Sequence, residues 1–507
     1  MTAMNCASCR PVSCCGCPAA SRRSFLKTAA LAASTLPFTR LPVLGEPARQ
    51  QPIRTALKVQ PVLMYQIHKR REATSWRSWG GLHTEQDIAQ EKERIGRELT
   101  QMRSHAGFAL EVLPLQTVET PEQAAGIAGG GHDVLIQYAA SGGVKTLEAL
   151  TDAGKWNLMF LRHRSGPVYL WYEIAHPRFL RKTVDEFGQP GMTNADVVVD
   201  SHAEVLLRLR GLYGLKNTLG KRIVAVGGPS GWGAGGKTAP DVARNLWKLD
   251  IRTVGYPELG ERIARARGNT AVVKRSAAAA ERFLNEKGVK LETSRDFVVK
   301  AFLLTEVFRD LLDEAQTDAI TINQCMGTIM GMSETTACLP LSVLNDDGYM
   351  AFCESDFVVI PSGILLHGIA NKPVFLNDPT HPHDGVVTLA HCTAPRKMDG
   401  VHSEPARILT HFESDYGAAP KVEMRKAQKV TNLVPDFHCK KWVGFTGDIV
   451  DVPFLEICRS QIDVGFKGDT EKLLGEMGGF HWMTSYGDYV RESEYALKKL
   501  GVDMVRI

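Results

Sequence analysis

The sequence has no uninterrupted apolar run of about 18 residues, the length that a membrane-spanning helix needs. It also lacks internal repeats and low-complexity tracts. Neither sign of charge dominates, because 60 Lys and Arg stand against 56 Asp and Glu, and the small surplus lies within the first 48 residues. The remaining residues therefore lack the basic field that nucleic-acid binding requires. With 507 residues and 44% hydrophobic content, we expect several globular domains, no membrane span and no nucleic-acid partner.

Paired metal-binding cysteines are missing from most of the chain. The six cysteines after residue 300 contain no C-x-x-C pair, so we expect most of them to be small buried hydrophobic residues, with a disulfide as the alternative. They are Cys325, Cys338, Cys353, Cys392, Cys439 and Cys458. The other five of the 11 cysteines precede Arg22, and we expect them to be removed with a leader rather than to bind zinc.

The first residues are typical of an export signal. Arg22 and Arg23 lie in the segment SRRSFLK, which a weakly apolar stretch follows over 28–36. This pattern predicts a twin-arginine signal peptide over 1–48 and a periplasmic or otherwise exported protein. The alternative is a chance arginine pair before an alanine-rich helix.

Short apolar segments that alternate with amphipathic helices indicate two α/β units. In the first unit we expect two helices to begin after the N-caps Thr84 and Thr120. A second unit of the same kind follows and contains a glycine-rich loop. The predicted strands are 56–67, 108–115, 133–138, 156–162, 222–226 and 251–256, and the predicted later helices are 206–212 and 298–315.

After residue 347 the pattern changes to short β-like segments and turns, until a final predicted helix over 489–500. The predicted fold class is therefore α/β, with two doubly wound parallel-sheet domains followed by a mixed, mainly β C-terminal domain. The predicted domains, after the signal peptide, are 50–170, 171–347 and 348–507.

The glycine-rich segment 231–238, GWGAGGKT, has the form of a phosphate-binding loop and follows a predicted strand. Pro229, Trp232 and Pro240 stiffen or crowd it, and no later strand ends in an unambiguous magnesium-binding aspartate. We interpret it as a strand-to-helix turn that lines a cleft, with an anionic or polyhydroxylated ligand as the alternative. No nucleotide binding is predicted.

The densest polar pattern lies between residues 324 and 392. We expect 351–360 to form a strand, on which Glu354 and Asp356 would project from the same face. Two carboxylates on an apolar strand require a cation or a polar ligand. Carboxylates with one or two imidazoles suit Mn²⁺, Mg²⁺ or Co²⁺ better than a thiolate zinc site. The other candidates are Glu334, Asp378, His381, His383, His391 and His481.

Several motifs follow one another over residues 320–507. They are Cys338-Leu-Pro-Leu-Ser342, Leu344-Asn345, Gly348, Cys353-Glu-Ser-Asp356, Phe375-Leu-Asn-Asp378, His391-Cys392 and His481 followed by Tyr486-Gly-Asp488-Tyr489. In order and spacing they resemble the L-fucose/L-arabinose isomerase-like family. The two α/β units are similar to the two N-terminal domains of that family.

The resemblance implies a metal-dependent aldose–ketose isomerase, an intramolecular oxidoreductase that acts on a small carbohydrate with Mn²⁺ (or Mg²⁺ or Co²⁺). It implies Glu334, Asp356 and His481 as metal ligands, with Glu354 as the alternative first carboxylate. Glu334 and Asp356 would also move the proton between C1 and C2 as base and acid. We expect Glu354, Asp378 and His391 to bind substrate.

Trp76 and Trp79 lie in the segment 74–81 and are predicted to stack on a sugar, since the resemblance implies an aromatic supplied by a neighbouring subunit of a homo-oligomer such as a hexamer. Burial in the core or in an interface is the alternative for both. Export is unusual for a sugar isomerase. The alternatives are thus an epimerase, a lyase or a glycoside-cleaving enzyme on the same scaffold, or a non-catalytic sugar-binding protein of the envelope.

Overall fold

The computed structural model describes residues 53–181 and 189–507. The twin-arginine segment lies outside these residues, so export stays a prediction. Among the described helices, none is both long and apolar enough to cross a membrane.

The first unit is built on a parallel sheet with the order β2-β1-β4-β5-β6, and β3 also pairs with β1. Of the predicted strand 108–115 only 110–112 is a strand, β2, and the next strand, β3, begins after residue 115, because Pro114 has no N–H to continue a ladder. The strands are β1 Leu57–Met64, β2 Leu110–Val112, β3 Gln116–Val118, β4 Val134–Ala139, β5 Trp156–Leu161 and β6 Val197–Val199.

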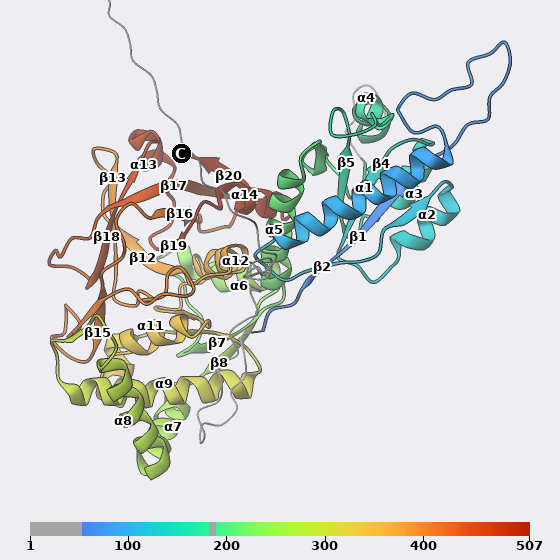
Figure 1. Cartoon of the computed structure of the whole chain (residues 1–507). Coiled ribbons are helices and arrows are strands. Elements are labelled where there is room, and N and C mark those ends of the chain that lie inside the picture. Colours follow the sequence, from blue (N-terminus) through green and yellow to red (C-terminus); the bar gives the residue numbers. More distant parts are fainter. Residues whose placement is uncertain (1–52, 182–188) are drawn as a thin grey trace, which may run out of the picture. The chain divides into compact units, whose positions relative to one another are not determined.

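Helices cover both faces of this sheet (Figure 1). Leu57, Val59 and Leu63 of β1 pack with α1 and α5, whereas Val62 and Met64 pack with α2 and α3. This alternation follows from the two-residue period of a strand. The helices are α1 Glu85–Ser104, α2 Pro121–Ala128, α3 Val144–Leu150, α4 Trp171–Ala175 and α5 His202–Thr218.

The two predicted N-caps are confirmed. The side chain of Thr84 accepts a hydrogen bond from the backbone N–H of Asp87, and the Asp87 carboxylate accepts one from the backbone N–H of Thr84. Thr120 and Gln123 form the same reciprocal pair at the start of α2, where Pro121 is the first helical residue. Such capping boxes satisfy backbone N–H groups that the first turn of a helix leaves free.

A buried ion-pair network ties α1 to the end of β5. Arg162 has no exposed side-chain surface, and its Nε lies 2.5 Å from Glu91 Oε1. Its two terminal nitrogens donate to Glu98 at 3.0 and 2.6 Å. Tyr169 also donates its hydroxyl hydrogen to Glu91, at 2.6 Å. The guanidinium is therefore desolvated and depends on its carboxylates.

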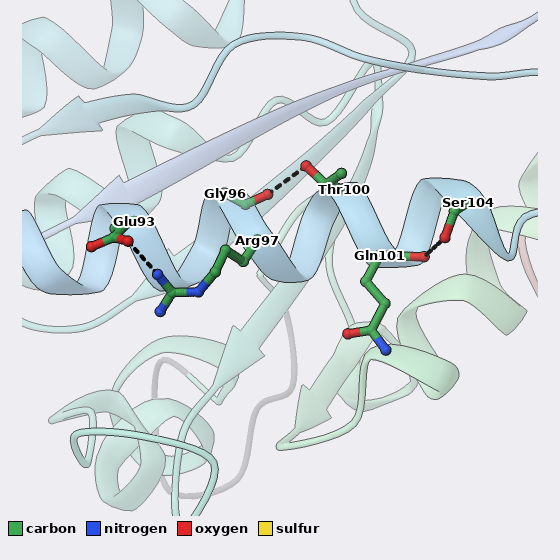
Figure 2. Close-up of a pocket in the computed structure, with 6 residues that line it drawn as sticks. All are labelled: Glu93, Gly96, Arg97, Thr100, Gln101 and Ser104. Atoms are coloured by element: carbon green, nitrogen blue, oxygen red, sulfur yellow. Dashed lines mark hydrogen bonds and ion pairs between the residues drawn. The ribbon is translucent and has the colours of Figure 1, made fainter. Parts of the chain in front are cut away.

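Replacing Glu91 with alanine is expected to lower the free energy of unfolding by about 3 kcal/mol, because it leaves a buried charge with only part of its compensation. Glu93→Ala is the matched control, since Glu93 and Arg97 form an exposed pair on the same helix at 2.5 Å (Figure 2). The control should change stability by less than about 0.5 kcal/mol. Urea unfolding followed by circular dichroism measures both, and equal effects would contradict the prediction.

The second unit has a parallel sheet in the order β11-β10-β7-β8. The predicted strand 222–226 is confirmed as β7, and the helix 298–315 lies within α9. Here too, helices pack on both faces of the sheet. The elements are β7 Arg222–Val226, α6 Ala239–Asn245, β8 Asp250–Val254, α7 Tyr256–Gly268, α8 Thr270–Leu284, α9 Arg295–Ala315, β10 Ala319–Ile322, α10 Met330–Ser333, α11 Cys338–Asp346, β11 Met350–Phe352 and α12 Ile360–Ala370.

The predicted strand over 351–360 is wrong beyond its second residue. Strand β11 ends at Phe352, and Glu354 and Ser355 then adopt left-handed backbone conformations with φ of 64° and 48°. These two residues turn the chain, and α12 begins at Ile360. All 11 residues of α12 are buried, so it has no polar face and no helical period to reveal it in the sequence. Strand β11 and helix α12 lie after residue 347, where the second domain was predicted to end, although β11 is part of the second sheet.

The C-terminal unit is an antiparallel barrel, which confirms a mainly β third part. Six strands pair in the closed order β16-β19-β12-β13-β18-β17, with β16 and β17 completing the ring, and β20 adds in parallel beside β17. A separate small sheet has the order β15-β14-β9. The elements are β9 Val289–Leu291, β12 Phe375–Pro379, β13 Val386–His391, β14 Ala406–Leu409, β15 Ala419–Val422, β16 Lys429–Val434, β17 Lys441–Asp451, β18 Ser460–Phe466, α13 Thr470–Glu476, β19 Trp482–Tyr486, α14 Val490–Lys498 and β20 Asp503–Arg506.

Candidate metal and catalytic site

The candidate site lies at the carboxyl ends of β7 and β11, where parallel sheets commonly place their ligands. The chain after β11 is held against the glycine-rich loop after β7. Ser230 donates its N–H to the carbonyl of Ser355 at 3.1 Å and accepts one from Phe357 at 3.0 Å. These contacts hold the left-handed backbone of Glu354 and Ser355, a conformation that persists only where the surroundings enforce it.

Asp356 is buried between two protein segments. Its Oδ1 accepts hydrogen bonds from the backbone N–H groups of Trp232 at 3.2 Å and Val358 at 3.0 Å. Its Oδ2 lies 2.7 Å from Nδ1 of His481, which immediately precedes β19. Both oxygens of Asp356 are therefore occupied, and the contact fixes the orientation of the imidazole.

The other ring nitrogen of His481 faces two more carboxylates. Its Nε2 lies 3.3 Å from Oε2 of Glu354 and 3.1 Å from Oδ1 of Asp378. Asp378 comes from β12 of the barrel. The Glu354 side chain is 50% exposed, whereas the imidazole is buried. The group is thus open to solvent on the side of Glu354.

His391, the last residue of β13, completes the group. Its Nδ1 lies 3.1 Å from Oγ1 of Thr393, and its Nε2 lies 3.8 Å from Oε1 of Glu354. A carboxylate oxygen of Asp378, a ring nitrogen of His391 and a ring nitrogen of His481 all lie within 4.8 Å of one another. The two buried imidazoles therefore direct Nε2 toward the same carboxylates, while each Nδ1 has a partner of its own.

Two atoms of this group have no hydrogen-bond partner among residues 53–181 and 189–507, although both are buried. They are Oδ1 of Asp378 and Nε2 of His481. The two atoms are 3.1 Å apart, but their geometry is not that of a hydrogen bond. Such an arrangement fits two donor atoms that coordinate the same bound ion, because buried polar atoms otherwise almost always have a hydrogen-bond partner. The donor set suits a divalent cation.

The charges of the group shift its pKa values in opposite directions. Burial lowers the pKa of both histidines, but contacts with Glu354 and Asp356 outweigh it and raise the pKa of His481 to about 10. Contacts with Glu354 and Asp378 likewise raise the pKa of His391 to about 9. Despite burial, the two imidazoles hold the pKa of Glu354 well below its usual range. Burial raises the pKa of Asp378.

Of the predicted ligands, Glu334 is not brought to this group. It follows α10 with a left-handed φ of 54°, and its carboxylate pairs with Arg267 at 3.0 Å and Lys300 at 2.9 Å. The hydrogen bond from Lys300 is the main cause of the lowered pKa of Glu334, and the charge of Arg267 lowers it further. Glu354, the alternative first carboxylate, is the one that faces the imidazoles.

None of the contacts described for the predicted aromatic residues involves the carboxylate–histidine group. Cζ of Arg77 lies over the Trp76 ring, 5.2 Å from the ring centre. The Trp79 side chain is 63% exposed. Stacking across a subunit interface stays a prediction. His381 and His383 form a tight turn, in which Nδ1 of His383 contacts the carbonyl of His381 at 3.0 Å.

The glycine-rich loop contributes contacts that the sequence interpretation did not assign to single residues. A Cβ on Gly231 would lie 2.1 Å from the carbonyl oxygen of Gly236, so the spacing of these glycines lets the loop close on itself. Trp232 and Phe480 stack edge to face at 4.7 Å, and both are nearly half exposed. Phe480 in turn contacts His481, with ring centres 4.8 Å apart. An exposed aromatic pair therefore borders the group.

A shallow depression on α1 contains none of these side chains. Glu93, Gly96, Arg97, Thr100, Gln101 and Ser104 line it. Figure 2 shows that its interactions are local, such as Thr100 donating to the carbonyl of Gly96 at 2.8 Å. These contacts belong to the surface of one helix.

No protein-family model and no curated protein sequence matches the chain.

Proposed function

We propose that the protein is a divalent-metal-dependent carbohydrate isomerase that interconverts an aldose and a ketose. The observation that carries the proposal is the convergence of Glu354, Asp378, His391 and His481 at the carboxyl end of a parallel sheet. The order of motifs over 320–507, which resembles the L-fucose/L-arabinose isomerase-like family, supports the same chemistry.

Glu354, His391 and His481 are the proposed holders of the cation, with Mn²⁺ as the first choice. A ligand carboxylate must be ionised at the working pH, and the low pKa of Glu354 meets that requirement. Asp356 is proposed to orient His481 through Nδ1, an arrangement common for metal-binding histidines. This assignment differs from the sequence prediction, in which Asp356 and Glu334 bind the metal directly.

Asp378 is the proposed carrier of the proton that moves between C2 and C1. A carrier needs a pKa closer to the working pH than an ordinary aspartate has, and burial raises the pKa of Asp378. In the aldose-to-ketose direction it takes the proton from C2 and returns it to C1, while a proton passes from O2 to O1. The cation supplies Lewis-acid stabilisation of the negative charge that develops on these oxygens.

The proposed substrate approaches beside Trp232 and Phe480. Their exposed faces offer an apolar surface for a sugar ring next to the polar group. This position agrees with the alternative of a polyhydroxylated ligand at the glycine-rich loop.

Isomerase activity is tested by incubating the manganese-loaded protein with aldoses in D₂O and following the products by NMR. We expect a ketose with deuterium at C1, because a carried proton exchanges with solvent. Glu334→Gln is the matched control and should retain at least about half of the activity, since Glu334 is a surface residue. Deuterium at C2 of an epimeric aldose would indicate epimerisation. No exchange with any sugar, despite bound metal, would contradict the proposal.

Metal binding is expected to release protons. At pH 7.5 the pKa values of about 10 and 9 leave His481 and His391 protonated in the metal-free protein, so binding through both Nε2 atoms should expel about two protons. Affinity for Mn²⁺ should therefore rise with pH until about pH 10. Titration calorimetry in two buffers of different ionisation enthalpy counts these protons.

The same histidines make the metal-free protein less stable in alkali. Their folded-state pKa values exceed the ordinary 6.5, so their stabilisation is complete below about pH 6.5 and is lost as the pH rises through 9 to 10. Equal binding enthalpies in the two buffers, or a pH-independent affinity, would contradict both expectations.

A further inference from the structure

Five of the six cysteines in the described chain gather beside the carboxylate–histidine group. Cys325, Cys338, Cys353 and Cys392 are buried, and Cys458 is partly exposed. The thiol of Cys338 donates to Cys392, and the pKa of Cys325 is affected by Cys338 and Cys353 and that of Cys392 by Cys458, so the five thiols are neighbours. The sixth, Cys439, instead contacts Trp247 and Trp442. These five thiols therefore lie together in the fold.

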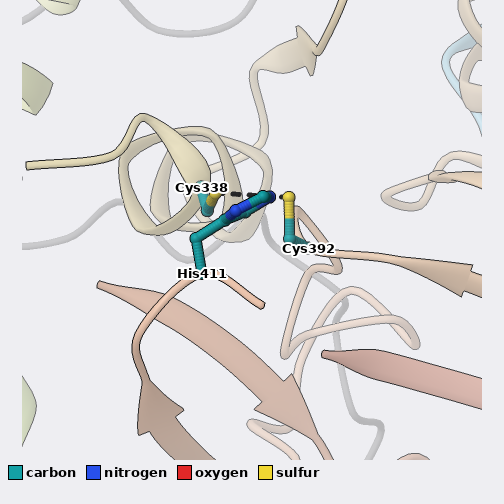
Figure 3. A group of neighbouring side chains, drawn as sticks. All are labelled: Cys338, Cys392 and His411. Atoms are coloured by element: carbon teal, nitrogen blue, oxygen red, sulfur yellow. Dashed lines mark hydrogen bonds between the residues drawn. The ribbon is translucent and has the colours of Figure 1, made fainter. Parts of the chain in front are cut away.

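A histidine joins the centre of this group. Sγ of Cys338 and Sγ of Cys392 are 3.2 Å apart, and a ring nitrogen of His411 lies within 4.8 Å of both. Figure 3 shows the three side chains converging from the start of α11, the end of β13 and the segment after β14. All three are buried. The sulfur separation far exceeds the 2.05 Å or so of a disulfide bond.

These positions suit a tetrahedral ion. With zinc–sulfur bonds of about 2.3 Å, two thiolates lie roughly 3.8 Å apart, so a shift of about half an ångström would accommodate the metal. Nδ1 of His411 lies 3.4 Å from Oγ of Ser414, which leaves Nε2 for the thiols. The contact also matches the common pattern in which a metal-binding histidine uses its second nitrogen for a hydrogen bond. Cys325 is a further buried thiol near Cys338, but it lies outside this group of three ligand atoms.

We propose that Cys338, Cys392 and His411 bind a zinc ion, at a site separate from the carboxylate–histidine group. Thiolates and imidazole select zinc over the harder ions that carboxylates prefer. Cys392 follows His391, and Cys353 beside the cluster precedes Glu354. The ion would thereby fix two segments that supply the neighbouring group. The zinc site does not depend on the isomerase proposal.

The test uses the full-length protein purified without chelators. We expect about one equivalent of zinc by elemental analysis, and sulfur neighbours from two thiolates with a nitrogen from one imidazole by X-ray absorption at the zinc edge. Exchange for Co²⁺ should give thiolate charge-transfer and tetrahedral ligand-field bands. Cys392→Ser and His411→Ala should weaken or remove these bands, whereas Cys439→Ser and His481→Asn should retain them.

Two results would overturn the proposal without any variant. One is a wild-type protein whose zinc has no sulfur neighbours, or which takes up Co²⁺ without thiolate bands. The other is a Cys338–Cys392 disulfide, detected by mass spectrometry of an unreduced digest. Because the wild-type spectra decide these points, a variant that fails to fold leaves the test intact.

Discussion

Replacing His481 with asparagine is expected to abolish manganese binding at the carboxylate–histidine group and to lower kcat/KM at least about a thousand-fold, since a bound cation supplies several kcal/mol of charge stabilisation. Asparagine places its amide near the position of Nδ1, so it can still donate to Oδ2 of Asp356. It has no atom at the position of Nε2, which faces Glu354 and Asp378. The substitution therefore removes the proposed ligand atom while it keeps a partner for the buried Asp356.

Manganese content after gel filtration and steady-state kinetics measure the two effects. His402→Ala is the control, because His402 is exposed and pairs only locally with Asp399 at 2.9 Å. It should keep full metal content and activity. A folded His481→Asn protein with normal manganese would remove His481 from the ligand set.

Much of the fold was predictable because it depends on local patterns. The apolar segments of β1, β4, β5 and β7 alternate with helices, and Thr84 and Thr120 satisfy the free amides of the helices they begin. Helix α12 was not predicted, because a completely buried helix has no polar face and therefore no helical period of hydrophobicity in its sequence. The closure of the barrel depends on pairing between β16 and β17 and around the ring, which no single segment encodes.

The candidate site was predictable in composition but not in geometry. Glu354 and Asp356 were expected on one face of a strand, yet a left-handed turn brings both to His481. Glu334 was assigned as a ligand from the family resemblance, but Lys300 of α9 and Arg267 of α7 pair with it at the surface. The thiol cluster gave no spacing signal, because its members come from separate elements that only tertiary packing brings together.

Asp356→Asn is expected to weaken manganese binding about 10- to 100-fold without removing the site. Asparagine can still accept hydrogen bonds from the backbone of Trp232 and Val358, so the turn should persist. Its amide hydrogens would then face Nδ1 of His481, and that nitrogen would have to become an acceptor. The ring proton would move to Nε2, the atom that we assign to the metal. The variant thus presents the wrong tautomer.

This result separates the role inferred from the structure from the direct ligation predicted by the sequence. If Asp356 orients His481, a saturating manganese titration should restore one equivalent of metal and a large part of the activity. If Asp356 is itself a ligand, no concentration should restore full occupancy. Asp463→Asn is the matched control, since Asp463 accepts from Oγ1 of Thr388 at 2.6 Å on another barrel strand, and an amide oxygen can do the same. The control should bind manganese as tightly as the wild type. Restored occupancy would therefore identify His481 as the ligand and Asp356 as the group that keeps its Nε2 free of a proton.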